Sequence, residues 1–309
     1  FEECLQYTAS QFIIHKAGET RIKAGYHWFD SNMRDTFIAL PGIALSGSTA
    51  KIFEDVLTST QKYFYEGLFA KEISTHNIHP EYDADTSLWF FWTLQQYEKE
   101  TIKSKKQLWK EYGDTLKSIL NAYKQGTHKN IRMEANGLIW SDDLTRPLTW
   151  FDAQGDYGAI VPRNGYVVEV NALWYNALCF YREVMPSQWT EEMESLLQLV
   201  EKSFCNIFIN EHGYLFDYVN PHSTRRDWSV RPNMIFATSL PYSPLPKSTR
   251  RSVIEIITRE LRTPKGLRSL SPKSDGYQPQ CHGTQLQREQ AYYNGSVWPW
   301  LLGPYFEAC

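Results

Sequence analysis

Apolar side chains recur at spacings of three and four residues along most of the chain, which is typical of helices that bury one face. Strand-like alternation is sparse, and we expect only a short hairpin around residues 137–140 and 158–168. Pro232 would stand in the first turn of its helix, a position that suits proline. The ten expected helices cover residues 1–15, 34–45, 50–70, 83–100, 104–125, 169–184, 189–210, a run after Arg231–Pro232, 247–261, and a segment that opens near Ser296.

The loops between these helices alternate in length. Loops before the odd-numbered helices are short, whereas those before the even-numbered helices are long and carry all but two of the eleven tryptophans. If helices run up and down around a circle, every second helix begins at the same end, and the long loops meet there. The pattern predicts an all-α (α/α)6 barrel with an acidic, aromatic crater; an ordinary helical bundle is the alternative. The long loops are 25–35, 77–92, 140–174, 212–233 and 277–300.

The number of expected helices falls short of a complete barrel. Such a barrel has twelve helices, and the pattern gives ten, with Cys309 inside a helical run. We therefore expect residues 1–309 to form a single barrel domain that lacks its last inner helix. The first residue is Phe1 rather than methionine, so a targeting signal cannot be read.

Composition excludes several classes of protein. Lys plus Arg number 32 against 35 Asp plus Glu, and the resulting net charge of -3 argues against a nucleic-acid partner. No run approaches the roughly 18 apolar residues of a membrane helix. The five scattered cysteines lack CxxC spacing, which favours free thiols and a cytoplasmic location. Phosphate-binding and HExxH motifs are missing from the sequence, so we expect no cofactor.

Asp152 is the strongest candidate for chemistry. It follows Trp150 and Phe151 in the longest loop between helices. Burial beside aromatic rings raises the pKa of a carboxyl group, and a protonated carboxyl is what glycosidic general acid catalysis needs. The alternative is an aspartate that caps a helix or a turn.

Two acidic motifs open inner helices in the first half of the chain. Arg34 and Asp35 are adjacent and could hold one sugar through several hydrogen bonds, although an acid is also favoured at a helix start. Asp83 and Asp85 are two positions apart. We expect one of them to cap the helix and the other to bind sugar. No further ligands follow at calcium-loop spacing, so no metal is expected.

The second half of the chain adds further candidates. Glu169 opens the sixth helix, where an acid is also comfortable for electrostatic reasons alone. Two motifs, Arg231-Pro232-Asn233 and the segment from Tyr292 to Trp300, complete the rim, and their Asn and Tyr side chains offer uncharged hydrogen-bond partners. Trp298 or Trp300 could stack on a pyranose ring, although half of these aromatic side chains would simply fill the core.

The order of these motifs resembles the C-terminal α-1,6-glucosidase domain of bacterial and archaeal glycogen debranching enzymes. Each motif is weak alone, but together they are specific and run from Ala24 to the end of the chain. The matching stretches are 24–29, Arg34-Asp35-Thr36 through Gly42, 84–90, Thr149-Trp150-Phe151-Asp152-Ala153, 168–174, Arg231-Pro232-Asn233, 266–272 and 292–304.

The resemblance implies an (α/α)6 catalytic domain related to glucoamylases, which hydrolyses the α-1,6-linked glucose stub of trimmed glycogen or dextrin with inversion. Asp152 matches the general acid, and Arg34 with Asp35 matches the pair that holds the terminal glucose. Glycogen or an α-glucan oligosaccharide would be the partner. The expected sugar-binding residues are Trp28, Arg34, Asp35, Asp85, Trp150, Glu169, Asn171, Arg231, Tyr293 and Trp298.

The chain also departs from the family's pattern. The family usually has His at the position of Tyr293 and Asp at the position of Glu289. Its general base is a glutamate beyond the Trp-Pro-Trp motif, which would lie past Cys309, and Glu169 is the internal alternative. The family's preceding β-rich domain is also missing from this sequence. The remaining alternatives are a carbohydrate-binding barrel without catalysis and another barrel glycosidase, such as a glucoamylase, trehalase or mannosidase.

Overall fold

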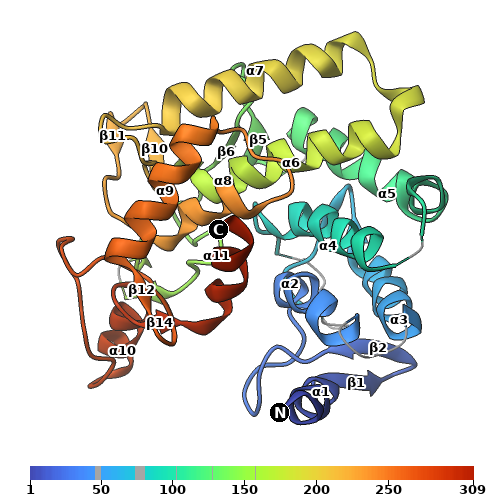
Figure 1. The fold of residues 1–309 in the computed structure, drawn as a ribbon, viewed down its shortest axis with the longest axis horizontal. Helices are drawn as coiled ribbons and strands as arrows, with labels where there is room; N and C mark the ends of the chain where they lie inside the picture. The colour runs from blue at the N-terminus through green and yellow to red at the C-terminus, as the bar shows by residue number, and fades with distance from the viewer. Residues whose placement is uncertain (46–49, 74–80, 102, 127, 157) are drawn as a thin grey trace. The chain divides into compact units, whose positions relative to one another are not determined.

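The computed structural model describes residues 1–45, 50–73, 81–101, 103–126, 128–156 and 158–309 (Figure 1). The chain divides into two compact units. Unit 1 holds residues 1–127 and 180–188, and unit 2 holds residues 128–179 and 189–309. The expectation of a single domain over 1–309 stays a prediction.

The described residues of unit 1 form five helices and two hairpins, with short η1 (Gln61–Tyr63) and η2 (Pro186–Gln188) beside them. Helix α2 packs against α3 and α4, and the rings of Phe37, Phe69 and Phe90 meet there at centroid distances of 5.0–5.3 Å. Helix α5 begins with a capping box between Ser104 and Gln107, a sequence signature of a helix start. The elements are α1 (Glu2–Ser10), β1 (Ile13–Lys16), β2 (Glu19–Ile22), α2 (Met33–Ala44), α3 (Ala50–Thr60), β3 (Phe64–Tyr65), β4 (Leu68–Phe69), α4 (Thr86–Glu100) and α5 (Lys105–Gln125).

Unit 2 combines helices with a five-stranded sheet in the order β11-β10-β9-β6-β5. Smaller sheets are formed by β7 with β8 and by β12, β13 and β14. Helix α6 (Val168–Val184), which continues into residues of unit 1, starts directly after β9, so the sheet fixes where its first turn lies.

The remaining elements of unit 2 follow in chain order (Figure 1). The strands are β5 (Ile131–Met133), β6 (Ile139–Ser141), β7 (Gln154–Gly155), β8 (Gly158–Ala159), β9 (Gly165–Val167), β10 (Tyr218–Asn220), β11 (Arg225–Arg226), β12 (Arg262–Thr263), β13 (Gly266–Arg268) and β14 (Val297–Trp298). The helices are α7 (Glu191–Phe208), η3 (Pro232–Ile235), α8 (Phe236–Ser239), α9 (Lys247–Glu260), α10 (Gln285–Tyr293), η4 (Pro299–Leu301) and α11 (Leu302–Ala308).

Most of the expected helices are confirmed within a few residues. The expected pairing of 137–140 with 158–168 is also confirmed, because Trp140 on β6 faces Tyr166 on β9. Pro232 stands at the start of η3, as expected, but η3 and α8 together form only a short helical segment. The helix expected to open near Ser296 begins a few residues later, because β14 comes first and η4 and α11 follow it. Helix α10 was not predicted, since its sequence is mostly polar.

Two expected helices are wrong at their C-terminal ends. Residues 13–15 belong to β1, and residues 64–69 form β3 and β4. Both hairpins turn on two consecutive residues with positive φ, Ala17-Gly18 (54° and 74°) and Glu66-Gly67 (50° and 85°). Such two-residue turns join antiparallel strands, and apolar spacing alone does not reveal them.

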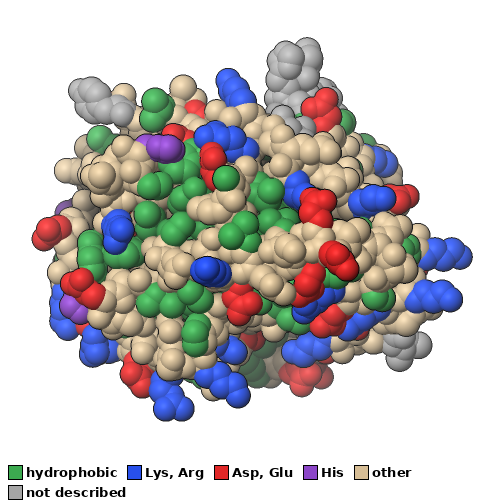
Figure 2. Space-filling model, turned by 90° about the horizontal axis from the view of Figure 1, so that it is seen from above, with side chains coloured by type: hydrophobic (Ala, Val, Ile, Leu, Met, Phe, Trp, Pro, Cys, Tyr) green, Lys and Arg blue, Asp and Glu red, His purple; other side chains and the backbone are tan. Residues whose placement is uncertain are grey.

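Charged side chains of both signs are interspersed on the face shown in Figure 2, in keeping with the near balance of charge in the sequence. Within the described part of the chain, no helix is both long and apolar enough to span a membrane.

Candidate active site

The segment that carries Asp152 lies between β6 and β7 in unit 2. Phe151 and Trp150 are buried, whereas Asp152 itself is half-buried. The Trp150 ring meets Trp298 and Trp300 edge-on, at centroid distances of 4.9 and 5.2 Å. Edge-to-face ring pairs at such distances contribute about 0.5–1.5 kcal/mol each beyond the area that they bury. This packing fixes the backbone that leads into the Asp152 carboxylate.

Tyr293, at the end of α10, donates a hydrogen bond of 3.0 Å from its hydroxyl to Oδ1 of Asp152. Burial raises the pKa of Tyr293 well above its usual value, and the negative charge of Asp152 raises it further. The phenol therefore stays protonated at any working pH and remains a donor to the carboxylate. Trp298 lies beside this pair, with its ring centroid 5.7 Å from that of Tyr293.

A pocket of about 330 Å³ adjoins this segment. Its walls come from the residues that directly follow Asp152 and from one face of α10, the helix that also carries Tyr293. Two carboxylates, Asp156 and Glu289, line it. The lining residues are Ala153, Gln154, Gly155, Asp156, Gln285, Leu286 and Glu289.

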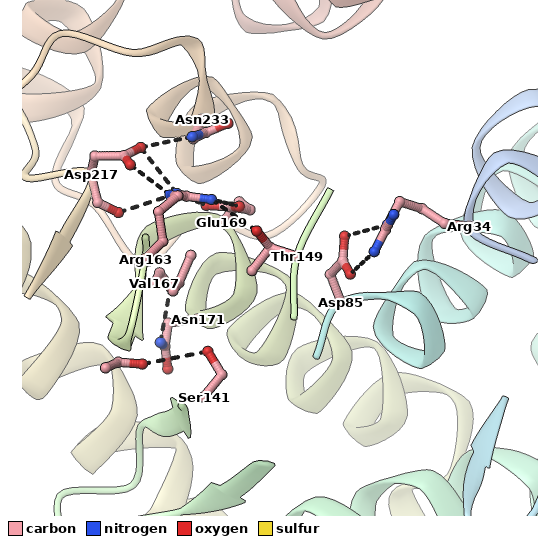
Figure 3. Close-up of polar contacts among 11 residues, drawn as sticks. Arg34, Asp85, Ser141, Thr149, Arg163, Val167, Glu169, Asn171, Asp217 and Asn233 are labelled. Atoms are coloured by element: carbon pink, nitrogen blue, oxygen red, sulfur yellow. Dashed lines mark hydrogen bonds and ion pairs between the residues drawn. The ribbon is translucent and has the colours of Figure 1, made fainter. Parts of the chain in front are cut away.

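A buried ionic cluster centred on Arg163 (Figure 3) contacts the ring of Phe151. Its guanidinium donates to Asp217 at 2.6 Å and to Glu169 at 2.6 Å, and a weaker bond of 3.3 Å reaches Thr149. Asn233 donates to the same Asp217 carboxylate at 2.7 Å. A charge taken out of water needs partners of this kind, because an unpaired buried charge is costly.

Glu169 is fully buried within this cluster. Burial raises its pKa, and the Arg163 guanidinium opposes that rise. Both of its carboxylate oxygens accept hydrogen bonds from Arg163. In this arrangement Glu169 contacts protein rather than an open pocket.

Arg231 is also buried, and it faces Phe151 from another element. Its guanidinium donates to the carbonyl oxygens of Ser269 and Tyr293 at 3.2 and 2.8 Å, and to the Asn294 side chain at 2.9 Å. The guanidinium carbons of Arg163 and Arg231 lie 5.3 and 5.4 Å from the centroid of the Phe151 ring. Two cations thus contact the ring that precedes Asp152, an arrangement that stabilises its position.

Asn171 joins the sheet to α6. Its amide accepts a hydrogen bond of 2.7 Å from the Ile139 backbone and donates to the Ile139 carbonyl oxygen. It also donates to the Val167 carbonyl oxygen (Figure 3). The side chain is fully buried. Its polar groups are thus engaged inside the fold.

A second buried ionic cluster lies in unit 1. Arg34 donates to Asp85 at 2.8 and 2.9 Å (Figure 3). It also donates to Asp83 at 2.5 Å. Burial raises the pKa of Asp85, and Arg34 opposes that rise. Asp85 stands at the N-cap position of α4, as expected for one of the two acids, but its side chain makes no cap hydrogen bond. Asp83 binds Arg34. Asp35, next to Arg34, is exposed, and Trp28 is exposed as well.

The structure thus brings four predicted residues together in unit 2: Asp152, Trp150, Tyr293 and Trp298. Arg231 and Glu169 lie behind them. Sequence reasoning missed Arg163 and Asp217, whereas Asn233 belongs to the predicted Arg231-Pro232-Asn233 motif and binds Asp217 rather than an open site. The available signal was an acid inside an apolar run, Val168-Glu169-Val170 and Phe216-Asp217-Tyr218, which requires a buried cation nearby. Among the described residues, no group of three or more His, Cys, Asp or Glu side chains is placed to hold a metal ion.

Comparison with known proteins identifies the family to which the chain is similar. The family model described as amylo-alpha-1,6-glucosidase matches residues 7–309. A glycogen debranching enzyme of Saccharomyces cerevisiae is 22% identical, over 89% of this chain and 24% of that protein. The chain therefore spans about a quarter of the length of this curated relative.

Two solved structures share the fold. A GH63 mannosylglycerate hydrolase from Thermus thermophilus matches with a TM-score of 0.65 and 11% identity, over 95% of this chain and 84% of that one. A structure described as a wild-type glycosidase matches with a TM-score of 0.57 and 11% identity, over 87% and 71%. The expected all-α (α/α)6 class is confirmed by these likenesses. The chain belongs to the amylo-alpha-1,6-glucosidase family of glycoside hydrolases.

Proposed function

We propose that this protein removes α-1,6-linked glucose stubs from glycogen or limit dextrin by inverting hydrolysis, with Asp152 as the general acid. The observation that carries the proposal is the setting of Asp152. Its half-buried carboxylate accepts a hydrogen bond from Tyr293, and the residues that directly follow it in the chain line a pocket of about 330 Å³. A general acid must reach the glycosidic oxygen, and this carboxylate has access that a fully buried one lacks.

The other strong candidates for an acid or base are engaged elsewhere. Glu169 and Asp217 share the Arg163 guanidinium, and Asp85 is held by Arg34. All three carboxylates are buried. An ionised base must reach a water molecule on the far side of the sugar, so this locking disfavours Glu169 as the base.

The proposal takes the base from the family's pattern, a glutamate beyond the Trp-Pro-Trp motif. In an inverting enzyme the two carboxyl groups should stand roughly 6.5–9.5 Å apart, which leaves room for the attacking water. Asp152 would protonate the leaving oxygen while that base activates water. Trp150, Trp298 and Tyr293 would border the glucose ring, and Arg34, Asp35, Asp85 and Trp28 stay predictions as sugar contacts.

The test is glucose release from a phosphorylase-trimmed limit dextrin. The wild type, Asp152→Asn and a matched control, Asp114→Asn on the exposed face of α5, would be compared as the 309-residue chain and within the full-length gene product. We expect Asp152→Asn to lose about 10²–10⁴ in rate, and the control to match the wild type.

The anomer released decides the stereochemistry. β-Glucose, detected by NMR before mutarotation, supports inversion, and α-glucose contradicts it. Full activity of Asp152→Asn would remove Asp152 from the mechanism. A failure to release glucose in every version, with dextrin binding retained, would favour a carbohydrate-binding protein without catalysis.

A further inference from the structure

A second pocket in unit 2 has no part in the chemistry assigned to Asp152. Its volume is about 480 Å³, within the range of roughly 300–1,000 Å³ that is typical of small-molecule sites. It shares no lining residue with the pocket beside Asp152. The walls come from the segments around His212 and Trp228, from one face of α9, and from residues 271–274. The lining residues are His212, Tyr214, Trp228, Val230, Ser252, Glu255, Ile256, Arg259, Glu260, Ser271, Lys273 and Ser274.

One wall of this pocket is aromatic. Trp228 is 41% exposed, so part of its ring is accessible to a ligand. Its indole is held edge-on by the buried Phe216, at 4.7 Å and 86° between the rings. The rings of His212 and Tyr214 stack at 13° beside it, and His212 lies 5.6 Å from Trp228. An exposed ring that the fold holds in place is suited to stacking on the apolar face of a sugar.

The opposite wall is polar and balanced in charge. Glu255 and Glu260 face Arg259 and Lys273, so the formal charges cancel. Glu260 is already engaged, because Lys273, Ser271 and Arg259 donate to it at 2.8, 3.0 and 3.1 Å. A strongly charged ligand would gain little here. A neutral molecule with many hydroxyl groups could hydrogen bond to donors and acceptors of both kinds.

We propose that this pocket is a second carbohydrate site that binds a segment of α-glucan chain on the Trp228 ring. The choice of an α-glucan rests on the proposed function. The aromatic wall, together with polar residues whose charges cancel, points to carbohydrate as the class of ligand. The site would retain the polymer while stubs are cleaved at Asp152. Its wall is also linked to that centre, since Val230 precedes Arg231, whose guanidinium binds the Tyr293 carbonyl.

The test measures maltoheptaose affinity by calorimetry in an Asp152→Asn background, where turnover does not interfere. Trp228→Ala should weaken binding roughly 3- to 10-fold, whereas Trp228→Phe should keep most of it. Tyr65→Ala, a ring of similar exposure (45%) in unit 1, is the matched control and should bind as the parent does. Ser252→Trp, which fills the pocket from the α9 side, should weaken binding without removing the Trp228 ring. If Trp228→Ala fails to fold, the affinity of Ser252→Trp for maltoheptaose tests the second site instead.

Hydrolysis of panose, a short substrate, separates this site from the proposed function. In the full-length gene product with Asp152 intact, Trp228→Ala should keep the wild-type rate within about twofold. Unchanged maltoheptaose affinity in both Trp228→Ala and Ser252→Trp, or no maltoheptaose binding by the parent, overturns the second site whatever the rate. Lost affinity in a protein that releases no glucose supports the site and overturns the proposed hydrolysis.

Discussion

The hydroxyl of Tyr293 donates to the Asp152 carboxylate across 3.0 Å, although 141 positions separate the two residues in the chain. This bond joins the end of α10 to the loop between β6 and β7. Burial raises the pKa of Tyr293, so the donor stays protonated. The bond therefore favours the ionised form of Asp152 and limits how far its aromatic surroundings can favour the protonated acid.

Tyr293→Phe removes this hydrogen bond and little else. A hydrogen bond to a charged group contributes about 1.5–3 kcal/mol, so misplacement of Asp152 should lower kcat roughly 10- to 100-fold on limit dextrin. Loss of the donor also favours the protonated acid, so the alkaline limb of the pH–rate profile should move to higher pH. Tyr292→Phe, the exposed neighbour, is the control. An unchanged pH profile would show that the bond does not set the state of Asp152.

How far the sequence predicts this site depends on the range of the interaction. Local signals work well: the capping box at Ser104 and Pro232 at the start of η3 mark real helix starts. Trp150 and Asp152 are close neighbours in the chain, so their shared surroundings are predictable. Arg163 and Asp217 are 54 positions apart, and no periodicity relates them.

The two hairpins of unit 1 and helix α10 were not predicted, and their local sequences explain why. The turns at Ala17-Gly18 and Glu66-Gly67 depend on positive φ at a non-glycine residue, which composition does not reveal. The mostly polar α10 lacks the apolar spacing that marks the other helices, and its capping box at Thr284 and Gln287 is the signal that was available.

Arg163→Met should be among the most damaging single changes in unit 2. It leaves Glu169 and Asp217 buried without their cation, and breaking a buried pair in this way typically costs about 3–5 kcal/mol in the free energy of unfolding. Lys51→Met, which removes the exposed Lys51–Asp55 pair, should change stability little and serves as the control. Urea denaturation measures both. Adding Glu169→Gln and Asp217→Asn to Arg163→Met should recover part of the loss, and a further loss would contradict the account.

Gly165 is required for the pairing of β9 with β10. Its φ is 124°, and a Cβ there would lie 2.6 Å from the Val219 carbonyl oxygen. Gly165→Ala should therefore cost more than the about 1–3 kcal/mol of backbone strain alone. Gly158→Ala is a matched control, because its φ is 117° and nothing lies within 4 Å of the added Cβ. Equal losses of unfolding free energy for the two variants would show that the carbonyl moves aside.

Glu19 makes part of the stability of unit 1 depend on pH. Burial opposes its ionisation, but hydrogen bonds from Arg21, Lys62 and Tyr63 outweigh burial and lower the pKa of Glu19 below its usual 4.5. An acid with a lowered folded pKa contributes stability above its unfolded pKa and loses it as the pH falls through the folded value. This contribution should be complete at pH 7, begin to decline as the pH falls towards 4.5, and disappear only below the lowered folded pKa.

Glu19→Gln removes the titration and tests this dependence. The variant should be less stable than the wild type at pH 7, because Arg21 is buried and loses its ionised partner. The difference in unfolding free energy should shrink as the pH falls, since the wild type then loses the same interaction. Glu3→Gln, an exposed change on α1, should follow the wild-type curve throughout. A difference between Glu19→Gln and the wild type that stays constant from pH 7 to pH 3 would show that Glu19 acts through packing rather than through its charge.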